Sequence, residues 1–362
     1  MRRLHYETLR PVCPLCRLSR NVDVPLSLAH VEREEGDTVV EGVLNCSFDG
    51  CLLEYPIVDC IPILVPSIRT FVSDNLHLLT ARDDLSERME SILGDSAGPG
   101  TPFDATRQHL STYAWDHYGD LDTDDSVGCA SHVSPGGVVR CMEEGIRLLG
   151  HEPTGPVVDI GCSVGRSALT MAAGSDALVL GIDAHLPMLR LAQRVLADSR
   201  VRYPRRRVGI VYDRREFEVE FEGAERVDFW ACDALCLPFS DGVFGFALGL
   251  NVLDCVASPQ GLLQEMRRIL GVPGSAVVST PFDWSPGATP VEAWIGGHSQ
   301  RGPQHGASEP FLRQLLTPGA HPQSIDGLRI TGENESFPWH ARTHERSTVV
   351  YDAHVVAAET TD

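Results

Sequence analysis

The chain has 362 residues, 43% of them hydrophobic and 22% charged, which is the composition of a globular protein with room for more than one module. Fifty acidic against 30 basic residues give a formal net charge of −20, which disfavours nucleic acid and anionic lipid as main partners. The 11 cysteines fit a reducing compartment, and no run approaches the ~18 apolar residues that span a bilayer. We therefore expect a cytoplasmic protein that acts on a small molecule; the sequence leaves open whether it forms a homodimer.

Two cysteine pairs stand in the first 68 residues, and we predict a small metal-held module there. Cys13 and Cys16 are two residues apart, and Cys46 and Cys51 follow about thirty residues later. Four thiolates in two close pairs suit a structural, tetrahedral zinc ion. The alternative is a set of unrelated reduced thiols.

The segment after the second pair reads Leu-Glu-Tyr-Pro-Ile-Val-Asp-Cys-Ile-Pro over residues 53–62. With the cysteine pairs it resembles the small zinc-ribbon proteins that partner tRNA, rRNA and release-factor methyltransferases. Cys60 replaces a glycine of that family and is an alternative ligand or a buried thiol. The resemblance implies a zinc-ribbon-like module over 1–68 that supports an adjoining enzyme.

Residues 69–152 are predicted to form a helical bridge and a lid. Apolar residues recur at helical spacing over 71–93 and 135–149, and the stretch 98–102 is a linker. Between them lies a dense group of aromatic and acidic residues, which contains Tyr113, Trp115, Asp116, His117, Tyr118, Asp120, Asp122, Asp124 and Asp125. This group either grips a cationic or heteroaromatic substrate or anchors the N-terminal half to the core.

Residues 157–166 have the pattern of a strand, a tight turn and a helix start. Val157 and Val158 lead to Asp159, and Gly161, Ser163 and Gly165 follow at alternate positions. Glycines here permit backbone conformations and close approaches that a Cβ would block. The spacing is not that of a pyrophosphate-binding loop, and an acid before the first glycine suits a ligand with a cationic amino-acid end, such as S-adenosylmethionine (SAM).

Further strands are predicted at 177–183, 229–234, 244–250 and 276–279, with helices at 187–197 and 260–270 between them. Polar residues end the strands: Asp183 can take the ribose hydroxyls, Asp233 can face the adenine amino group, and Asn251 closes the fourth strand. The repetition predicts a doubly wound α/β sheet over 153–362. The sequence does not assign a structure or a role to the arginine- and glutamate-rich insertion 199–226.

This order resembles the class I SAM-dependent methyltransferases over about 200 residues. The resemblance implies SAM as cofactor and a Rossmann-like methyltransferase domain over 153–362. The residues expected to contact SAM are Asp159, Gly161, Cys162, Ser163, Gly165, Arg166, Asp183, Ala184, Asp233, Ala234 and Asn251.

A closer resemblance joins residues 113–358 to the mercaptohistidine N-methyltransferase domain of ovothiol synthesis. It rests on the Asp-Ile-Gly-Cys-Ser-Val-Gly-Arg-Ser loop at 159–167, on Phe-Trp and Asp-Ala at 229–234, and on Asn-Val-Leu-Asp at 251–254. Pro-Phe-Asp-Trp at 281–284, Thr-Pro at 289–290 and Trp-Ile-Gly-Gly at 294–297 match as well. The chain departs from that group at 184–228 and in its N-terminal ribbon.

For catalysis we predict that Asp254 and Asn251 orient the acceptor nitrogen towards the methyl group. Methyl transfer from a sulfonium mainly needs alignment and exclusion of water. The walls of the pocket are predicted to be Tyr113, His117, Tyr118, Asp283 and Trp284. His117 is either a general base or a hydrogen-bonding strut, and Trp284 and Trp294 are alternatively core plugs.

Three functions follow from these residues. The first is SAM-dependent methylation of a nitrogen in a small amino-acid-like or heteroaromatic, histidine-like metabolite. The second is methylation of an rRNA or tRNA base, which predicts a basic face that unites the arginines of 200–207 with the pocket. The third is a non-catalytic protein that retains a SAM-binding fold.

Overall fold

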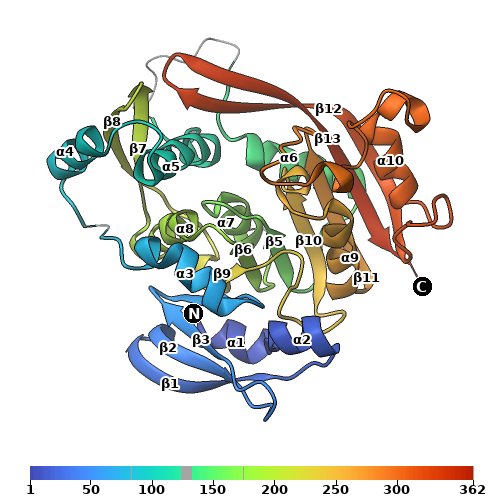
Figure 1. The fold of residues 1–362 in the computed structure, drawn as a ribbon, viewed down its shortest axis with the longest axis horizontal. Helices are drawn as coiled ribbons and strands as arrows, with labels where there is room; N and C mark the ends of the chain where they lie inside the picture. Colours follow the sequence, from blue (N-terminus) through green and yellow to red (C-terminus); the bar gives the residue numbers. More distant parts are fainter. Residues whose placement is uncertain (83, 124–132, 174, 362) are drawn as a thin grey trace.

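The buried apolar runs of the second half of the chain form a central sheet. The structure is a computed structural model that describes residues 1–82, 84–123, 133–173 and 175–361 (Figure 1). Strand β10 is almost wholly buried, as its apolar sequence predicts. The strands of this part are β5 (Val157–Ile160), β6 (Val179–Asp183), β9 (Val227–Cys232), β10 (Phe244–Leu250), β11 (Leu270–Thr280), β12 (Leu328–His344) and β13 (Ser347–Thr360).

The strand order in this part of the sheet is β9-β6-β5-β10-β11-β13-β12. Strands β9, β6, β5, β10 and β11 run parallel, so their carboxyl ends meet at one edge. Strand β13 inserts antiparallel beside β11 and pairs with β12. The order reverses next to β5, which makes the edge after β5 and β10 the switch point where such sheets bind ligands. The predicted doubly wound, Rossmann-like α/β sheet is confirmed.

Helices connect the parallel strands and cover the sheet, and their ends follow local sequence signals. Ser258 accepts a hydrogen bond from the Gly261 amide and caps α9, an interaction typically worth about 1 kcal/mol. Leu148 of α6 lies against Gly332 of β12, which tightens the packing beside the antiparallel strands. The helices of this layer are α6 (Gly137–Leu149), α7 (Arg166–Ala173), α8 (Leu186–Asp198), α9 (Pro259–Ile269) and α10 (Ser308–Leu315).

The first 64 residues extend the same sheet. Strands β1 (Leu26–Glu35), β2 (Thr38–Cys46), β3 (Glu54–Val58) and β4 (Ile61–Leu64) form an antiparallel meander. Strand β4 then pairs in parallel with β9, so that eleven described strands form one sheet. The short helices of this part are α1 (Arg3–Leu9) and α2 (Pro14–Arg20). The boundary near residue 68 stays a prediction, because backbone hydrogen bonds join the two parts.

The predicted bridge is helical. The pattern over 71–93 corresponds to two helices, α3 (Ile68–Leu79) and α4 (Glu87–Ala97), and α5 (Pro102–Tyr118) carries most of the aromatic and acidic group. Asp122 lies just beyond α5 and pairs with Arg215, whereas Asp124 and Asp125 lie outside the described residues. None of the described helices has the length and apolarity that crossing a bilayer requires.

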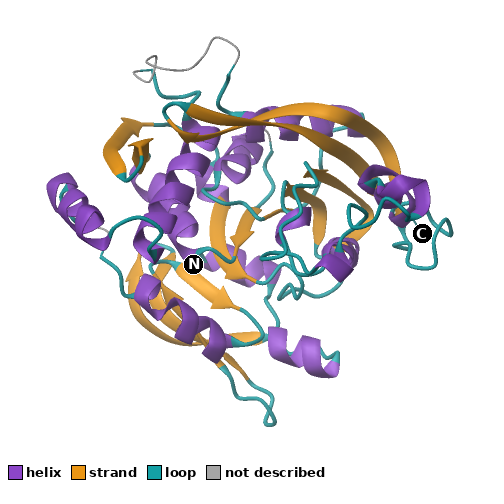
Figure 2. Ribbon diagram, turned by 45° about the horizontal axis from the view of Figure 1, so that its top comes forward, coloured by secondary structure: helices purple, strands orange, loops and turns teal. Residues whose placement is uncertain are grey.

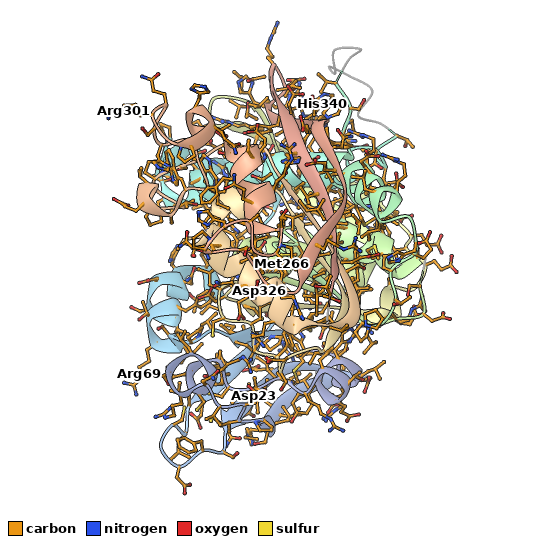
Figure 3. The ribbon with its side chains drawn as sticks, turned by 90° about the vertical axis from the view of Figure 1, so that its right-hand side faces the viewer. Asp23, Arg69, Met266, Arg301, Asp326 and His340 are labelled. Atoms are coloured by element: carbon orange, nitrogen blue, oxygen red, sulfur yellow. The ribbon has the colours of Figure 1, made fainter. Side chains whose placement is uncertain are left out.

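Two hairpins complete the molecule. The insertion 199–226 contains β7 (Arg200–Val208) and β8 (Val211–Glu218), which pack beside α5. The long β12–β13 hairpin arches away from the sheet (Figure 2). Its turn meets the insertion, where the Glu345 amide donates to the Arg206 carbonyl and Arg207 pairs with the Glu345 carboxylate. In Figure 3, His340 of this hairpin and Asp23 of the N-terminal part lie at opposite ends of the molecule.

Candidate active site

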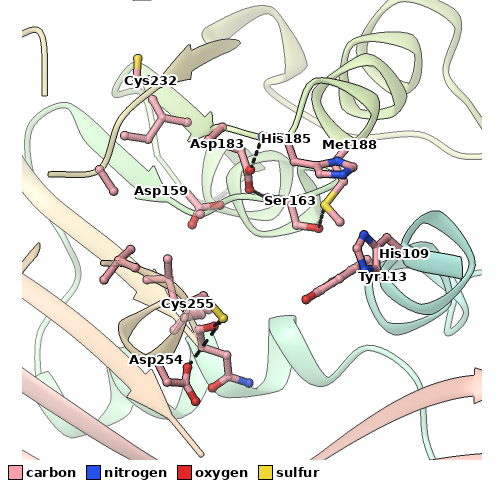
Figure 4. Close-up of a pocket in the computed structure, with 18 of the residues that line it drawn as sticks. His109, Tyr113, Asp159, Ser163, Asp183, His185, Met188, Cys232, Asp254 and Cys255 are labelled. Carbon is pink, nitrogen blue, oxygen red and sulfur yellow. Dashed lines mark hydrogen bonds between the residues drawn. The ribbon is translucent and has the colours of Figure 1, made fainter. Parts of the chain in front are cut away.

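A cavity of about 1140 Å³ lies at the carboxyl edge of the parallel strands. This volume exceeds the roughly 300–1,000 Å³ of pockets for single small ligands. Its walls come from the glycine turn, the ends of β6, β9 and β10, helix α5, the segment after β4 and the β12–β13 hairpin. Figure 4 shows that side chains of the glycine turn, of α5 and of the segments after β6 and β10 face a common space. The cavity therefore has room for a donor and an acceptor together.

The turn after β5 forms one wall. Gly161 and Ser163 both line the cavity with positive φ angles of 75° and 53°. The Ser163 amide donates to the Asp183 carboxylate over 2.9 Å, and the Ser163 hydroxyl lies 3.2 Å from the Met188 sulfur. A Cβ on Gly161 would stand 2.8 Å from Val252, so a larger residue would displace the neighbouring wall. Gly161 thus packs closely against Val252, which follows β10, and this position of the turn has no room for a side chain.

Three of the residues predicted to contact SAM lie behind this wall. Cys162 is buried, and Gly165 allows the turn to approach Phe229, whose ring would be 2.6 Å from an added Cβ. Arg166 pairs with Asp120 at 3.1 Å and donates to the His117 carbonyl. These three residues are not among the side chains that line the cavity. Their role is to pack the turn and to hold the end of α5 against α7.

Two acids beside the turn line the cavity, as the pattern predicts. Asp159 is 1% exposed and accepts a hydrogen bond from the Ser167 hydroxyl. Asp183 accepts from the amides of Ser163 and His185 at 2.9 and 2.8 Å. Burial raises the pKa of Asp159 to about 7 and also raises the pKa of Asp183. Both carboxylates therefore favour a positively charged or hydrogen-bond-donating ligand.

The raised pKa of Asp159 predicts a conflict between stability and binding. Below about pH 3.8 the Asp159 carboxyl is protonated in both the folded and the unfolded protein. Between about pH 3.8 and 7 only the folded protein keeps this proton, so the free energy of unfolding falls as the pH rises. Above about pH 7 both states are ionised, and the decrease in the free energy of unfolding is complete. We expect Asp159→Asn to raise the free energy of unfolding of the ligand-free protein by about 1–3 kcal/mol at pH 8.

The same substitution is expected to weaken binding of S-adenosylhomocysteine (SAH). Urea unfolding at pH 5 and pH 8 with titration calorimetry of SAH measures both effects. A variant that is less stable than the parent at pH 8 would contradict this electrostatic account.

Asp233 directly follows β9 and forms the next part of the cavity wall. It lines the cavity and accepts from the Leu235 amide at 2.9 Å, which fixes the turn that follows β9. Ala184 and Ala234 also line the cavity. Val65 and Phe71, which follow β4, face the same part of the cavity. The N-terminal part therefore contributes directly to the end of the cavity that Asp233 occupies.

The end of β10 supplies the predicted acceptor side. Asn251 has a positive φ of 51°, and its side-chain oxygen accepts from the Ser279 hydroxyl at 2.9 Å. Asp254 is 3% exposed and accepts from the Asp283 amide at 2.7 Å. Burial, reinforced by the charge of Asp283, raises the pKa of Asp254. Asn251, Asp254 and Asp283 all line the cavity, as the sequence predicts.

Helix α5 forms the facing wall, although only part of its predicted set does so. Tyr113 and His117 line the cavity. Tyr118 is fully buried and its hydroxyl donates to the Val164 carbonyl at 2.6 Å, so it supports the glycine turn from behind. Burial, with the nearby Arg166 charge, lowers the pKa of His117 to about 3. His117 is therefore a neutral and weak base, which disfavours the general-base role, and its Nδ1 atom has no hydrogen-bond partner among the described residues.

Trp284 lies away from the cavity, in contrast to the prediction that it walls the pocket. Its ring stacks on Trp294 with centroids 6.0 Å apart, and its indole nitrogen donates to Ser308 at 3.3 Å. The Trp294 indole donates to the Thr289 carbonyl. Both rings are only half-buried, and they pack on each other within the loop that presents Asp283, so the alternative of a core plug stays a prediction.

Several residues that line the cavity carry no predicted role. His109 and His185 lie with ring centroids 5.7 Å apart, one on α5 and one after β6. Trp339 and Tyr351 come from the long hairpin. His185, two residues after Asp183, could have been found from its position at a strand end. The sequence around Trp339 and Tyr351 gives no signal, because their placement depends on where the hairpin folds back.

The four predicted metal ligands come together in the N-terminal part. Ligand atoms of Cys13, Cys16, Cys46 and Cys51 all lie within 4.8 Å of one another. The Cys13–Cys51 and Cys16–Cys46 sulfur distances are 3.8 and 3.7 Å, close to the roughly 3.8 Å between thiolates on a tetrahedral zinc with 2.3 Å bonds. Cys60 is outside this group.

Comparisons with known proteins agree with this arrangement. Residues 158–278 match the model of the methyltransferase domain family. The chain is 22% identical over 170 residues to tocopherol O-methyltransferase of the Arabidopsis thaliana chloroplast, a match that covers 45% of this chain and 42% of that protein. The chain thus spans less than half the length of this relative.

The chain is also similar to solved structures of two methyltransferases. Phosphoethanolamine N-methyltransferase 2 of Haemonchus contortus, in complex with SAM, is 20% identical, with 48% of this chain and 35% of that chain covered and a TM-score of 0.33. Magnesium protoporphyrin IX methyltransferase of Synechocystis, with bound SAH, is 16% identical, with 71% and 99% covered and a TM-score of 0.39.

Proposed function

We propose that this chain, which contains a class I SAM-dependent methyltransferase domain, transfers a methyl group from SAM to a nitrogen of a small amino-acid-like or heteroaromatic metabolite. One observation carries the proposal. Asp159, Asp183 and Asp233 meet Asn251 and Asp254 at a single cavity, although they stand at the ends of different strands. Cofactor-type residues and a polar acceptor side thus share one enclosed space.

The donor half of the cavity fits SAM by its chemistry. Asp183, already fixed by two amides, presents carboxylate oxygens that ribose hydroxyls can donate to. Gly161 and Ser163 keep the backbone of the turn close, and Asp159 provides a negative charge near it. Asp233 and Ala234 border the side towards the N-terminal part. Bound SAM supplies an activated methyl group on a sulfonium, while the protein supplies position and excludes water.

The acceptor half contains hydrogen-bonding groups but no strong base among the described residues that line it. Asp254 and Asn251 lie on one side, with neutral His117 and Tyr113 on α5. A carboxylate that accepts from a ring N–H increases the electron density of the other ring nitrogen and orients it. Asp254 therefore acts as a positioning group for a neutral nitrogen nucleophile, and no proton needs to leave before the methyl group is transferred.

Mass spectrometry tests the proposal. The purified protein is incubated with SAM and a panel of histidine-like metabolites, and the methylated product and SAH are measured together. We expect a mass increase of one methyl group on an acceptor nitrogen. SAH that binds tightly while no acceptor in a broad panel gains a methyl group would favour the non-catalytic alternative.

Asp254 gives the sharpest test of the acceptor side. We expect Asp254→Ala to lower kcat/KM about tenfold, because the acceptor and the Asp283 amide both lose their partner, and Asp254→Asn to lower it less. SAH affinity by calorimetry should stay within about twofold in both variants, because the donor residues are untouched. Unchanged turnover in both variants would remove Asp254 from the chemistry.

The RNA alternative receives less support from the arginines of the insertion. That function predicts a basic face, but Arg200 pairs with Glu216, Arg205 with Asp213, and Arg207 with Asp213 and Glu345. Paired arginines offer less free positive charge to a phosphate backbone. A small-molecule acceptor is therefore the stronger proposal for this cavity.

We also propose that the four-cysteine cluster binds a structural zinc ion. The four sulfurs lie within 4.8 Å of one another, and four thiolates on one zinc ion leave no open position for a substrate, which is the arrangement of structural sites. The Tyr55 hydroxyl lies 3.2 Å from Cys13 Sγ, and Arg20 donates to Cys16 Sγ at 3.7 Å. Both contacts suit deprotonated thiolates that share their excess charge with neighbouring donors.

A further inference from the structure

The charge of the cavity is strongly one-sided. Seven aspartates line it: Asp74, Asp116, Asp159, Asp183, Asp233, Asp254 and Asp283. Within the part of the chain that the structure describes, neither a lysine nor an arginine lines it. Asp159, Asp183 and Asp233 belong to the proposed donor side, and Asp254 and Asp283 belong to the acceptor side. Burial raises the pKa of Asp116 to about 8, so this carboxyl is largely protonated at neutral pH. A ligand that brings negative charge to the acceptor side would therefore meet like charge from Asp254 and Asp283.

Two of these carboxylates form a pair at the acceptor end. The Asp283 amide donates to Asp254 at 2.7 Å, and the Tyr351 hydroxyl donates to Asp283 at 3.2 Å. Asp254 is nearly buried, and the charge of Asp283 raises its pKa further after the larger effect of burial. The charges of the exposed Asp283 and the nearly buried Asp254 repel each other, and a cation near both carboxylates relieves this repulsion.

The other groups around this pair suit an amine that also carries an apolar or aromatic part. His117 is 4% exposed, lines the cavity, and has no hydrogen-bond partner for its Nδ1 atom among the described residues. A neutral imidazole can donate to or accept from a ligand nitrogen. Tyr113, Trp339 and Tyr351 add aromatic rings, which attract cations. The His117 imidazole thus adds a neutral polar group to the wall that these rings form.

The donor and acceptor sides differ in the backbone amides that they offer to a negatively charged group. Helix α7 begins at Arg166, directly after the glycine turn, and the first amides of a helix attract negative groups. The carboxylate of SAM can use such backbone donors. At the acceptor end, the Asp283 amide is already taken by Asp254. A carboxylate on the acceptor would have to compete with Asp254 for this amide.

We infer that the acceptor is a small amine without a carboxylate or phosphate, whose one positively charged group binds Asp283 while Asp254 orients its neutral acceptor nitrogen. The inference rests on the proposed function and narrows it from amino-acid-like metabolites to amines. In the transfer step, the lone pair of a neutral acceptor nitrogen forms the N–C bond while the C–S bond breaks and its electron pair stays on sulfur. The positive charge moves from sulfur to nitrogen, and a proton bound to the acceptor ring system then leaves to water.

Matched imidazole probes test the charge requirement. SAH binding is measured first by calorimetry, because a protein that does not bind SAH would contradict the proposed function itself. Thermal shifts are then recorded with SAH plus millimolar histamine, L-histidine methyl ester, L-histidine or imidazolepropionate. We expect histamine and the ester to raise Tm, histidine to raise it less, and imidazolepropionate to leave it unchanged. Equal or larger shifts with imidazolepropionate, or no shift with either cationic probe, would overturn the inference while SAH binding stands.

A variant locates the cation. We expect Asp283→Asn to weaken histamine binding about tenfold, while SAH affinity changes by less than about twofold. The matched control is Asp352→Asn, which makes the same charge change on the exposed residue next to Tyr351, on the other face of β13. Equal losses of histamine affinity in the two variants would show that any removed negative charge weakens binding, and this result would overturn the assignment of the cation to Asp283.

Discussion

Asp183→Ala is expected to weaken SAH binding about 100-fold, which corresponds to about 2.7 kcal/mol. The Asp183 carboxylate accepts from the amides of Ser163 and His185, so it fixes the glycine turn and the start of α8 at once. Its removal deletes a hydrogen-bonding partner of the ligand and leaves two amides without an acceptor. Hydrogen bonds to a charged group contribute about 1.5–3 kcal/mol each, so losing one contact to the ligand accounts for the effect.

Two further variants separate charge from position. Asp183→Asn keeps an acceptor oxygen and should lose less affinity than the alanine variant. Asp176→Ala removes an exposed carboxylate before the other end of β6 and should bind SAH as the parent does. Calorimetry with SAH, together with circular dichroism to verify the fold, measures all three. If Asp183→Ala bound SAH within threefold of the parent, the carboxyl edge of the sheet would not be the donor site.

The sheet of the second half could be predicted from sequence because its strands are short, apolar and separated by amphipathic helices. Strand β10 occupies the predicted range 244–250, and α8 and α9 begin and end within about one residue of expectation. Once the strands are known, the parallel order places Asp159, Asp183, Asp233 and Asn251 at one edge. These contacts follow from topology, so the sequence alone could identify them.

Other features depend on pairings between distant segments. Nothing in Ile61–Leu64 indicates that β4 adds to β9, some 165 residues away, because an apolar strand of four residues could pair with many partners. Tyr351 and Trp339 reach the cavity only because β13 folds back beside β11. The sequence predicts that Tyr118 and Trp284 line the cavity, but Tyr118 is buried in the core and the half-buried Trp284 packs on Trp294 instead.

Cys16→Ser is expected to abolish zinc binding and to lower the free energy of unfolding by more than about 3 kcal/mol. Cys16 is completely buried, and its sulfur lies 3.7 Å from Cys46. Serine does not replace a thiolate ligand, and a site with three ligands holds its metal more weakly. Most residues of strand β1 are exposed, so this part of the chain has a small apolar core and depends on the cross-link for its stability. Zinc content by mass spectrometry and thermal unfolding measure the two effects.

The loss of zinc is also expected to weaken SAH binding at the donor site, because residues 12–14 beside the first cysteine pair contact the segment that follows Asp233. The Val12 amide donates to the Pro238 carbonyl at 2.9 Å, and Cys236 Sγ lies 3.4 Å from the Pro14 carbonyl. We therefore expect weaker SAH binding in the Cys16→Ser variant at a temperature where it is still folded. Cys60→Ser, in the same part of the chain but outside the cluster, is the matched control and should keep its zinc. Full zinc content in Cys16→Ser, or equal zinc loss in both variants, would show that the four sulfurs do not form the site.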